Sequence, residues 1–130
     1  MPVSSVQVEV SPGELIDKIT ILEIKLARLS DAGALANVRR EHDSLEREHA
    51  RLPGSPELTR LTTELKVVNE ALWVIEDDIR DCERAKDFGE KFVELARSVY
   101  RNNDRRAALK REINILLGST IIEEKSYAKY

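Results

Sequence analysis

A long stretch in the middle of the chain repeats apolar residues at alternating spacings of three and four. Such spacing keeps apolar side chains on one stripe of an α-helix and is typical of coiled-coil-like packing. It predicts one continuous helix over about 56–86, which at 1.5 Å per residue would be ~46 Å long. Part of a helix of that length must project or be covered by its neighbour. The eight residues of this seam are Leu58, Leu61, Leu65, Val68, Leu72, Ile75, Ile79 and Cys82.

Capping signals and apolar stripes predict three further helices. The run from Ser11 to Glu14 has the spacing of a capping box and begins a helix over about 12–29. Asp31 can cap a second helix over about 31–51, and Gly118 can end a helix over about 90–117. The tight turn before Pro56 predicts that the helices over 31–51 and 56–86 form an antiparallel hairpin, which protrudes at 35–75. The fold class is therefore all-α, an antiparallel bundle of about four helices.

The two ends of the chain carry weaker patterns. Val6, Val8 and Val10 alternate with polar residues, which indicates an extended arm over 3–10 or a short strand with one face buried. The segment 119–130 is apolar, then charged, then aromatic, so we expect it to dock on the helices or on the arm.

Composition narrows the classes of protein that the chain can belong to. At 130 residues it fits a single domain, with 42% hydrophobic and 35% charged residues but only five Gly and four Pro, a helical profile. A net charge of −3 does not indicate nucleic-acid binding. No apolar run reaches the ~20 residues of a membrane span, and no signal peptide is recognisable, so we expect a cytoplasmic protein. The single cysteine, Cys82, excludes a disulfide within the chain.

The candidate chemistry lies where the apolar stripe of the last helix is interrupted. Asn102, Asn103 and Arg106 occupy positions on this stripe, and such polar groups either form a solvated or structural network or line a pocket. Three arginines also recur there every four residues, a row suited to phosphate or carboxylate. If the pocket exists, it is a polar cleft between the last two helices. Its candidate ligand-binding residues are Glu76, Asp77, Arg80, Glu94, Arg97, Arg101, Asn102, Asp104 and Arg105.

The two histidines do not by themselves indicate a metal site. His42 and His49 lie on one face of the second helix with Glu46 between them. A metal site needs a third or fourth ligand, and the sequence pattern identifies none. We therefore predict neither a metal nor a cofactor.

Several polar segments together resemble a known family. They are GELIDKITILEIK at 13–25, LWVIEDDIR at 72–80, ELARSVY at 94–100 followed by NDRR at 103–106, and IEEKSY at 122–127. These segments are similar to those of a family of short, mostly bacterial proteins that is described only as a domain of unknown function. The resemblance implies no activity, cofactor or catalytic residue.

Two functions remain open from the sequence. The long seam with charged flanks favours a helical module that binds a protein partner or forms a homo-oligomer. We expect it to bind neither nucleic acid nor a membrane. The alternative is a small enzyme or sensor that binds an anionic metabolite through the arginine row. Whether the protein is an enzyme is left open.

Overall fold

Four α-helices make up the structure, a computed structural model that describes residues 2–130. They are α1 (Pro12–Arg28), α2 (Ala32–His49), α3 (Pro56–Arg84) and α4 (Glu90–Leu116). The all-α prediction is confirmed, and each helix begins at its expected residue or one residue later. None of the four combines the length and the apolar character that a membrane-spanning helix requires.

Side-chain caps determine where three of the helices begin. The Ser11 hydroxyl accepts a hydrogen bond from the Glu14 amide at 3.1 Å, and Asp31 accepts one from the Ala34 amide at 2.8 Å. Ser55 does the same for α3, accepting from the Leu58 amide at 3.1 Å. These bonds satisfy amide groups that have no partner in the first turn of a helix. The capping signals in the sequence therefore identified real helix starts.

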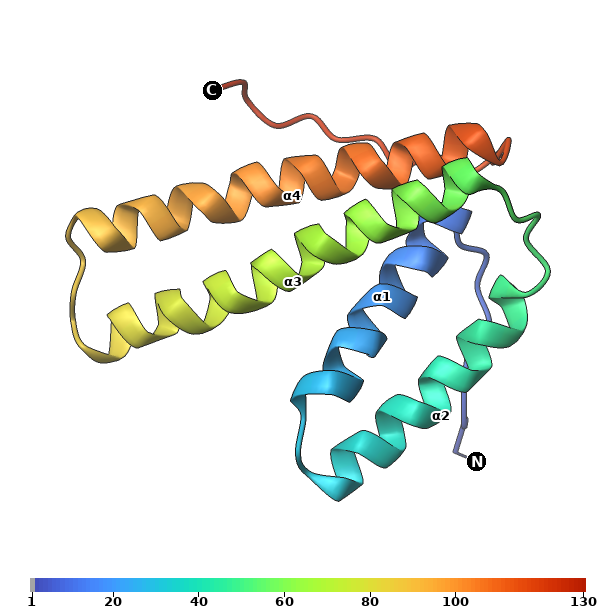
Figure 1. The fold of residues 1–130 in the computed structure, drawn as a ribbon, viewed down its shortest axis with the longest axis horizontal. Coiled ribbons are helices and arrows are strands. Elements are labelled where there is room, and N and C mark those ends of the chain that lie inside the picture. The colour runs from blue at the N-terminus through green and yellow to red at the C-terminus, as the bar shows by residue number, and fades with distance from the viewer. Residues whose placement is uncertain (1) are drawn as a thin grey trace.

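The helices pair as two hairpins that cross one another (Figure 1). α1 packs against all three other helices, whereas α2, within residues 2–130, packs against α1 alone. The predicted hairpin of α2 with α3, protruding at 35–75, is therefore wrong. The physical reason is that α2 has a thin apolar stripe, with Val38 as its one buried residue, while α1 is apolar on two faces and can cover α2 and the α3–α4 hairpin together.

The core lies where α1 crosses the α3–α4 hairpin. Its least exposed side chains are Leu61 and Leu65 of α3, Leu109 and Ile113 of α4, and Ile16 of α1. Five of the eight seam residues are buried in the structure. The other three, Leu72, Ile75 and Ile79, are only half-buried, because the hairpin projects beyond α1 and is left with two helices (Figure 1).

The N-terminal arm does not form the predicted strand. Residues 2–10 have no regular secondary structure, and Val6 is 79% exposed, so the expectation of one buried face is wrong. A strand needs a partner strand, and residues 2–130 provide none.

The C-terminal tail runs back along α4 (Figure 1). Gly118, with a φ of +67°, reverses the chain, and the Ser119 amide donates to the carbonyl of Asn114 at 2.9 Å. Further along, the Tyr130 ring packs edge-on against that of Tyr100, with ring centroids 4.9 Å apart. The side chains of the tail are exposed, so it lies on the surface of α4 rather than in the core.

Candidate functional site

A buried cluster of polar side chains joins α1 to α3 and α4. We call this cluster the polar junction; its members are Asp17 and Thr20 of α1, Asn69 of α3 and Arg106 of α4. Arg106 bonds both carboxylate oxygens of Asp17 through two different nitrogens, with its Nε at 2.9 Å from Oδ1. Asn69 Nδ2 donates to Asp17 Oδ1 and to Thr20 Oγ1, each at 2.9 Å. Asp17 is 0% exposed and the Arg106 side chain is 30% exposed, so the carboxylate is enclosed while its arginine partner reaches the surface.

The close approach of α1 to α4 beside the junction depends on Gly13. The Gly13 amide donates to Asn114 Oδ1 at 2.7 Å. A Cβ at this position would lie 2.4 Å from the carbonyl oxygen of Lys110, a distance that real atoms do not tolerate. The glycine therefore lets the first turn of α1 reach α4, and Asp17 follows one turn later at the height of Arg106.

The charges of the junction are fixed through the neutral pH range. Burial acts to raise the pKa of Asp17, but the hydrogen bonds from Arg106 and Asn69 outweigh it and hold that pKa below its ordinary value. The bond to Asp17 in turn raises the pKa of the Arg106 guanidinium. An acid held ionised in this way neither gives nor takes a proton at neutral pH. The junction is therefore suited to positioning helices and not to acid–base catalysis.

A second ring of charges lies beside the junction, nearer the surface. Lys110 Nζ is 2.6 Å from Glu14 Oε2 and 3.5 Å from Glu123 Oε2 of the tail. Next to Lys110, Asn114 and Glu123 is a cavity of about 30 Å³. That volume suffices for one or two water molecules but not for a metabolite.

The residues predicted from the sequence to bind an anion are mostly exposed and already have partners. Arg80 pairs with Glu76 on its own helix, and Arg97 pairs with Glu94 at 2.8 Å. Three other residues of the predicted set also have partners. Arg105 is 3.7 Å from Glu64, and Asn102 donates to the Ser98 carbonyl at 2.8 Å. Asp104 accepts from the Tyr130 hydroxyl at 2.8 Å.

In the part of the chain that the structure describes, no ion pair joins the acids of this set on α3, Glu76 and Asp77, to its arginines on α4. Arg101, the middle arginine of the row, is exposed as well. The set therefore forms separate surface pairs, and anion binding by it stays a prediction.

Sequence reasoning located half of the polar junction. The interruption of the α4 stripe pointed to Arg106, but its acidic partner was not singled out. Asp17 and Thr20 lie three residues apart on α1, on the same side as the buried Ile24. The sequence did contain a signal for Asp17, because it places this carboxylate on a second apolar face of the helix. Buried carboxylates are rare unless they are paired, so a buried partner such as an arginine could have been expected.

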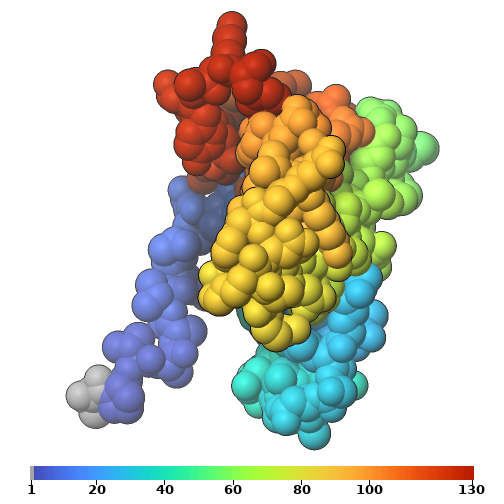
Figure 2. Space-filling model, turned by 90° about the vertical axis from the view of Figure 1, so that its left-hand side faces the viewer, coloured from blue at the N-terminus to red at the C-terminus, as the bar shows by residue number. Residues whose placement is uncertain are grey.

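Beyond the junction, the same side of the α3–α4 hairpin becomes apolar. Trp73 follows Asn69 by four residues on α3, and Val99 precedes Arg106 by seven on α4, so both continue the side that α1 covers. Phe92 and Ala96 share this side of α4. All four are half-buried, and we call them the distal face. Figure 2 looks onto the end of the molecule from which this hairpin projects.

Potential metal ligands gather elsewhere, at the contact of α1 with α2, where Glu23, His42 and Glu46 meet.

Comparison with known proteins assigns the chain no activity. A sequence model of a family of unknown function, DUF6165, matches residues 6–130. No curated protein matches the chain, and no solved structure matches it either.

Proposed function

We propose that this chain, which belongs to the family of unknown function DUF6165, is an association module that binds a second copy of itself through the distal face. The two α3–α4 hairpins would pack face to face with their tips overlapping and complete a four-helix bundle. A cytoplasmic location is part of this proposal, and the buried free thiol of Cys82 is compatible with it.

The observation that carries the proposal is the incomplete burial of the projecting hairpin. Near α1 the hairpin residues Leu61 and Leu65 are almost completely buried, whereas the distal-face residues Trp73, Phe92 and Val99 are half-buried. A helix stripe is stable in water when another element covers it, and two helices alone cannot cover each other on both sides. A second hairpin on the distal face would provide the missing cover.

The distal face has the symmetry that a two-fold contact needs. Asp78 on α3 and Ala96 on α4 are each seven residues from the loop at 85–89. These two residues therefore lie at the same height along the hairpin. On α4, Phe92 and Val99 flank Ala96 by four and three residues. A two-fold axis near Ala96 would therefore bring Phe92 of each copy opposite Val99 of the other, with the small alanine side chains at the crossing.

The charged residues beside the distal face are complementary in the same arrangement. Glu76 and Arg80 lie two residues on either side of Asp78 and form an exposed pair on α3. A two-fold axis at that height reverses α3 against the α3 of the second copy, so Glu76 of one would face Arg80 of the other. Such pairs at the rim of an interface favour a single register over alternatives.

Sedimentation equilibrium of the full chain tests the proposal directly. We expect a mass of twice 14.8 kDa at high concentration, falling towards the monomer as the protein is diluted from about 100 µM to about 1 µM. Trp73 is the single tryptophan and lies on the distal face. Its fluorescence emission should therefore shift to longer wavelength on dilution, as the indole becomes hydrated.

Two matched replacements of an alanine by glutamate locate the contact. Ala96→Glu puts two like charges at the two-fold crossing and should give a monomer. Ala71→Glu is the control, because Ala71 is also half-buried but follows Glu64 by seven residues, on the other side of the hairpin. The control should dimerise like the unchanged chain. A monomeric unchanged chain, or equal dimerisation of both variants, would contradict the proposal.

A further inference from the structure

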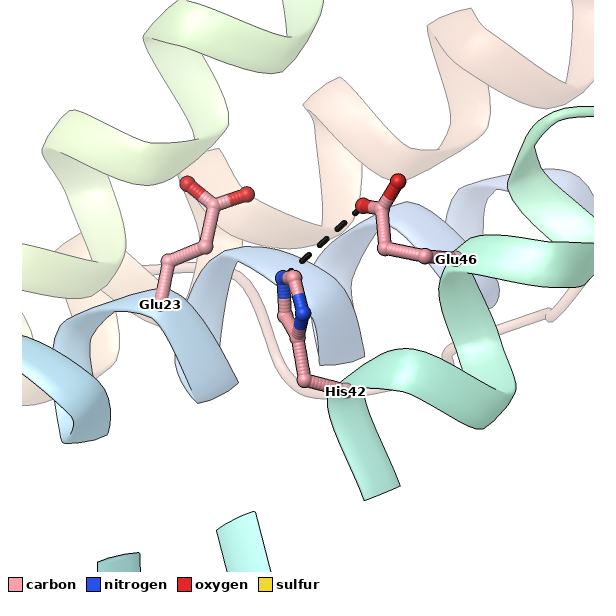
Figure 3. Close-up of side chains that lie close together, drawn as sticks. All are labelled: Glu23, His42 and Glu46. Atoms are coloured by element: carbon pink, nitrogen blue, oxygen red, sulfur yellow. Dashed lines mark ion pairs between the residues drawn. The ribbon is translucent and has the colours of Figure 1, made fainter. Parts of the chain in front are cut away.

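A histidine and two glutamates from α1 and α2 converge on one point of the surface between these helices. His42 and Glu46 lie four residues apart on α2, and Glu23 comes from the facing side of α1 (Figure 3). The nearest donor atoms of the three side chains all lie within 4.8 Å of one another. We propose that Glu23, His42 and Glu46 bind a divalent first-row transition-metal ion, with Zn²⁺ as the best fit, and that the ion clips α2 to α1.

The spacing of the donor atoms suits an ion better than direct contact. His42 Nε2 is 3.8 Å from Glu46 Oε1, which is too long for a hydrogen bond. Zinc bonds to nitrogen and carboxylate oxygen are ~2.0–2.2 Å long, so tetrahedral ligand atoms are ~3.4 Å apart. Rotation of the flexible glutamate side chains therefore brings all three donors to a central ion with little movement of the helices.

The types of ligand indicate which class of ion would bind. Imidazole favours zinc and its first-row neighbours over Mg²⁺ and Ca²⁺, which prefer all-oxygen sites. Three protein ligands leave the fourth position of a tetrahedral zinc ion for water. His42 and Glu46 are only partly exposed, so the site is accessible from solvent without being fully hydrated.

The position of the cluster explains what a bound ion would do. Val38 is the one buried residue of α2, so few apolar contacts hold this helix to α1. Glu23 on α1 and the pair of ligands on α2 stand on opposite sides of that weak contact. An ion that bonds to all three joins the two helices directly.

Lys66 of α3 opposes binding. Its Nζ donates to Glu23 Oε2 at 2.8 Å, and this bond raises the pKa of the lysine, which keeps its charge at neutral pH. An incoming cation must compete with this ammonium group for the Glu23 carboxylate and is repelled by its charge. Removal of the lysine should therefore strengthen metal binding, an effect that a surface cluster without a site would not produce.

Titration of the tag-free full chain with Zn²⁺, followed by calorimetry, and with Co²⁺, followed by its visible absorption, tests the site. We expect one ion per chain and the strong absorption bands of tetrahedral cobalt. A hundredfold excess of Zn²⁺ over its Kd should raise the Tm by about 10 °C. Absence of both one-to-one Zn²⁺ binding and the tetrahedral bands would overturn the proposal without any variant.

Four variants then assign the ligands. Glu23→Gln and His42→Gln should each weaken binding by at least about 100-fold, since even indirect partners of a metal ligand are worth 10–100-fold. His49→Gln is the matched control: His49 also faces Glu46, at 3.9 Å, but lies outside the cluster. It should bind Zn²⁺ unchanged, and Lys66→Met should bind about tenfold more tightly.

These variants change partly exposed side chains, so each should keep the helical circular dichroism of the unchanged chain without metal. Equal weakening in His42→Gln and His49→Gln, or unchanged affinity in Lys66→Met, would overturn the assignment.

Discussion

Replacing Arg106 by Met tests whether the polar junction holds α1 in place. The substitution keeps an unbranched apolar stem but removes the guanidinium group and its two hydrogen bonds to Asp17. The Asp17 carboxylate is 0% exposed and cannot turn to water, so it would retain only the bond from Asn69. Removing one partner of a buried ion pair costs about 3–5 kcal/mol. That is a large part of the ~7–20 kcal/mol expected for a domain of this length.

The pH dependence of this penalty identifies its cause. In the unchanged protein the pKa of Asp17 lies below 3.8, so its stabilising contribution is complete above that pH and is lost only as the pH falls further. Without Arg106, burial raises the pKa of this carboxyl above the unfolded value. The folded variant then binds a proton more readily than the unfolded chain, and its penalty shrinks as the pH falls from neutral towards about 4.5.

Urea unfolding followed by far-UV circular dichroism at pH 7 and about pH 4.5 measures both effects. The expected penalty at pH 7 corresponds to a midpoint shift of about 2 M urea. Arg105→Met is the control, because Arg105 is exposed and lies 3.7 Å from Glu64, a contact worth about 1 kcal/mol or less. A penalty for Arg106→Met no larger than the control, or equal at the two pH values, would refute the argument.

Four further substitutions test the packing and the backbone by the same urea unfolding assay. Leu65→Ala should cost about 3–5 kcal/mol because its side chain is 0% exposed, whereas Leu72→Ala should cost clearly less. Equal losses would place both residues in the same core. Gly13→Ala should destabilise by at least about 2 kcal/mol through its collision with α4; a neutral result would show that the first turn of α1 is not held there. Lys86→Gly should stabilise by roughly 0.5–1 kcal/mol, because Lys86 has a φ of +56°, and a loss of stability would contradict that backbone conformation.

Local signals in the sequence predicted the helices well. The spacing of the seam from Leu58 to Cys82 depends only on the period of the helix, and the Ser11 and Asp31 caps depend on residues within one turn. Both kinds of signal act within a helix and do not require knowledge of its neighbours. The helices that they predict are all present in the structure.

The partner of each helix face could not be predicted in this way. The sequence assigned α2 to α3 because a tight turn joins them. In the structure α2 packs on α1, which has two apolar faces and can cover α2 as well as the α3–α4 hairpin. The same difficulty affected polar residues. Asp17 and Arg106 are far apart in the sequence, as are Glu23 and His42, and periodicity gives the face of a residue but not what lies opposite. The exposed arginine row, conversely, has the spacing of a ligand site, but Arg97 and Arg105 each pair with a single acidic residue at the surface.

The polar junction gives the fold what apolar packing alone would not specify. α1 buries Leu15, Ile19 and Leu22 on an apolar face outside the core cluster at the hairpin, and apolar packing of this kind does not by itself specify one arrangement. Its other face carries Asp17, which must meet both Arg106 and Asn69. Any rotation or shift of α1 would leave a buried carboxylate and a carboxamide without partners, at a cost of several kcal/mol. One crossing of α1 over the hairpin is therefore strongly favoured. That crossing determines both where cover by α1 ends and the distal face begins, and which side of α1 presents Glu23 to α2.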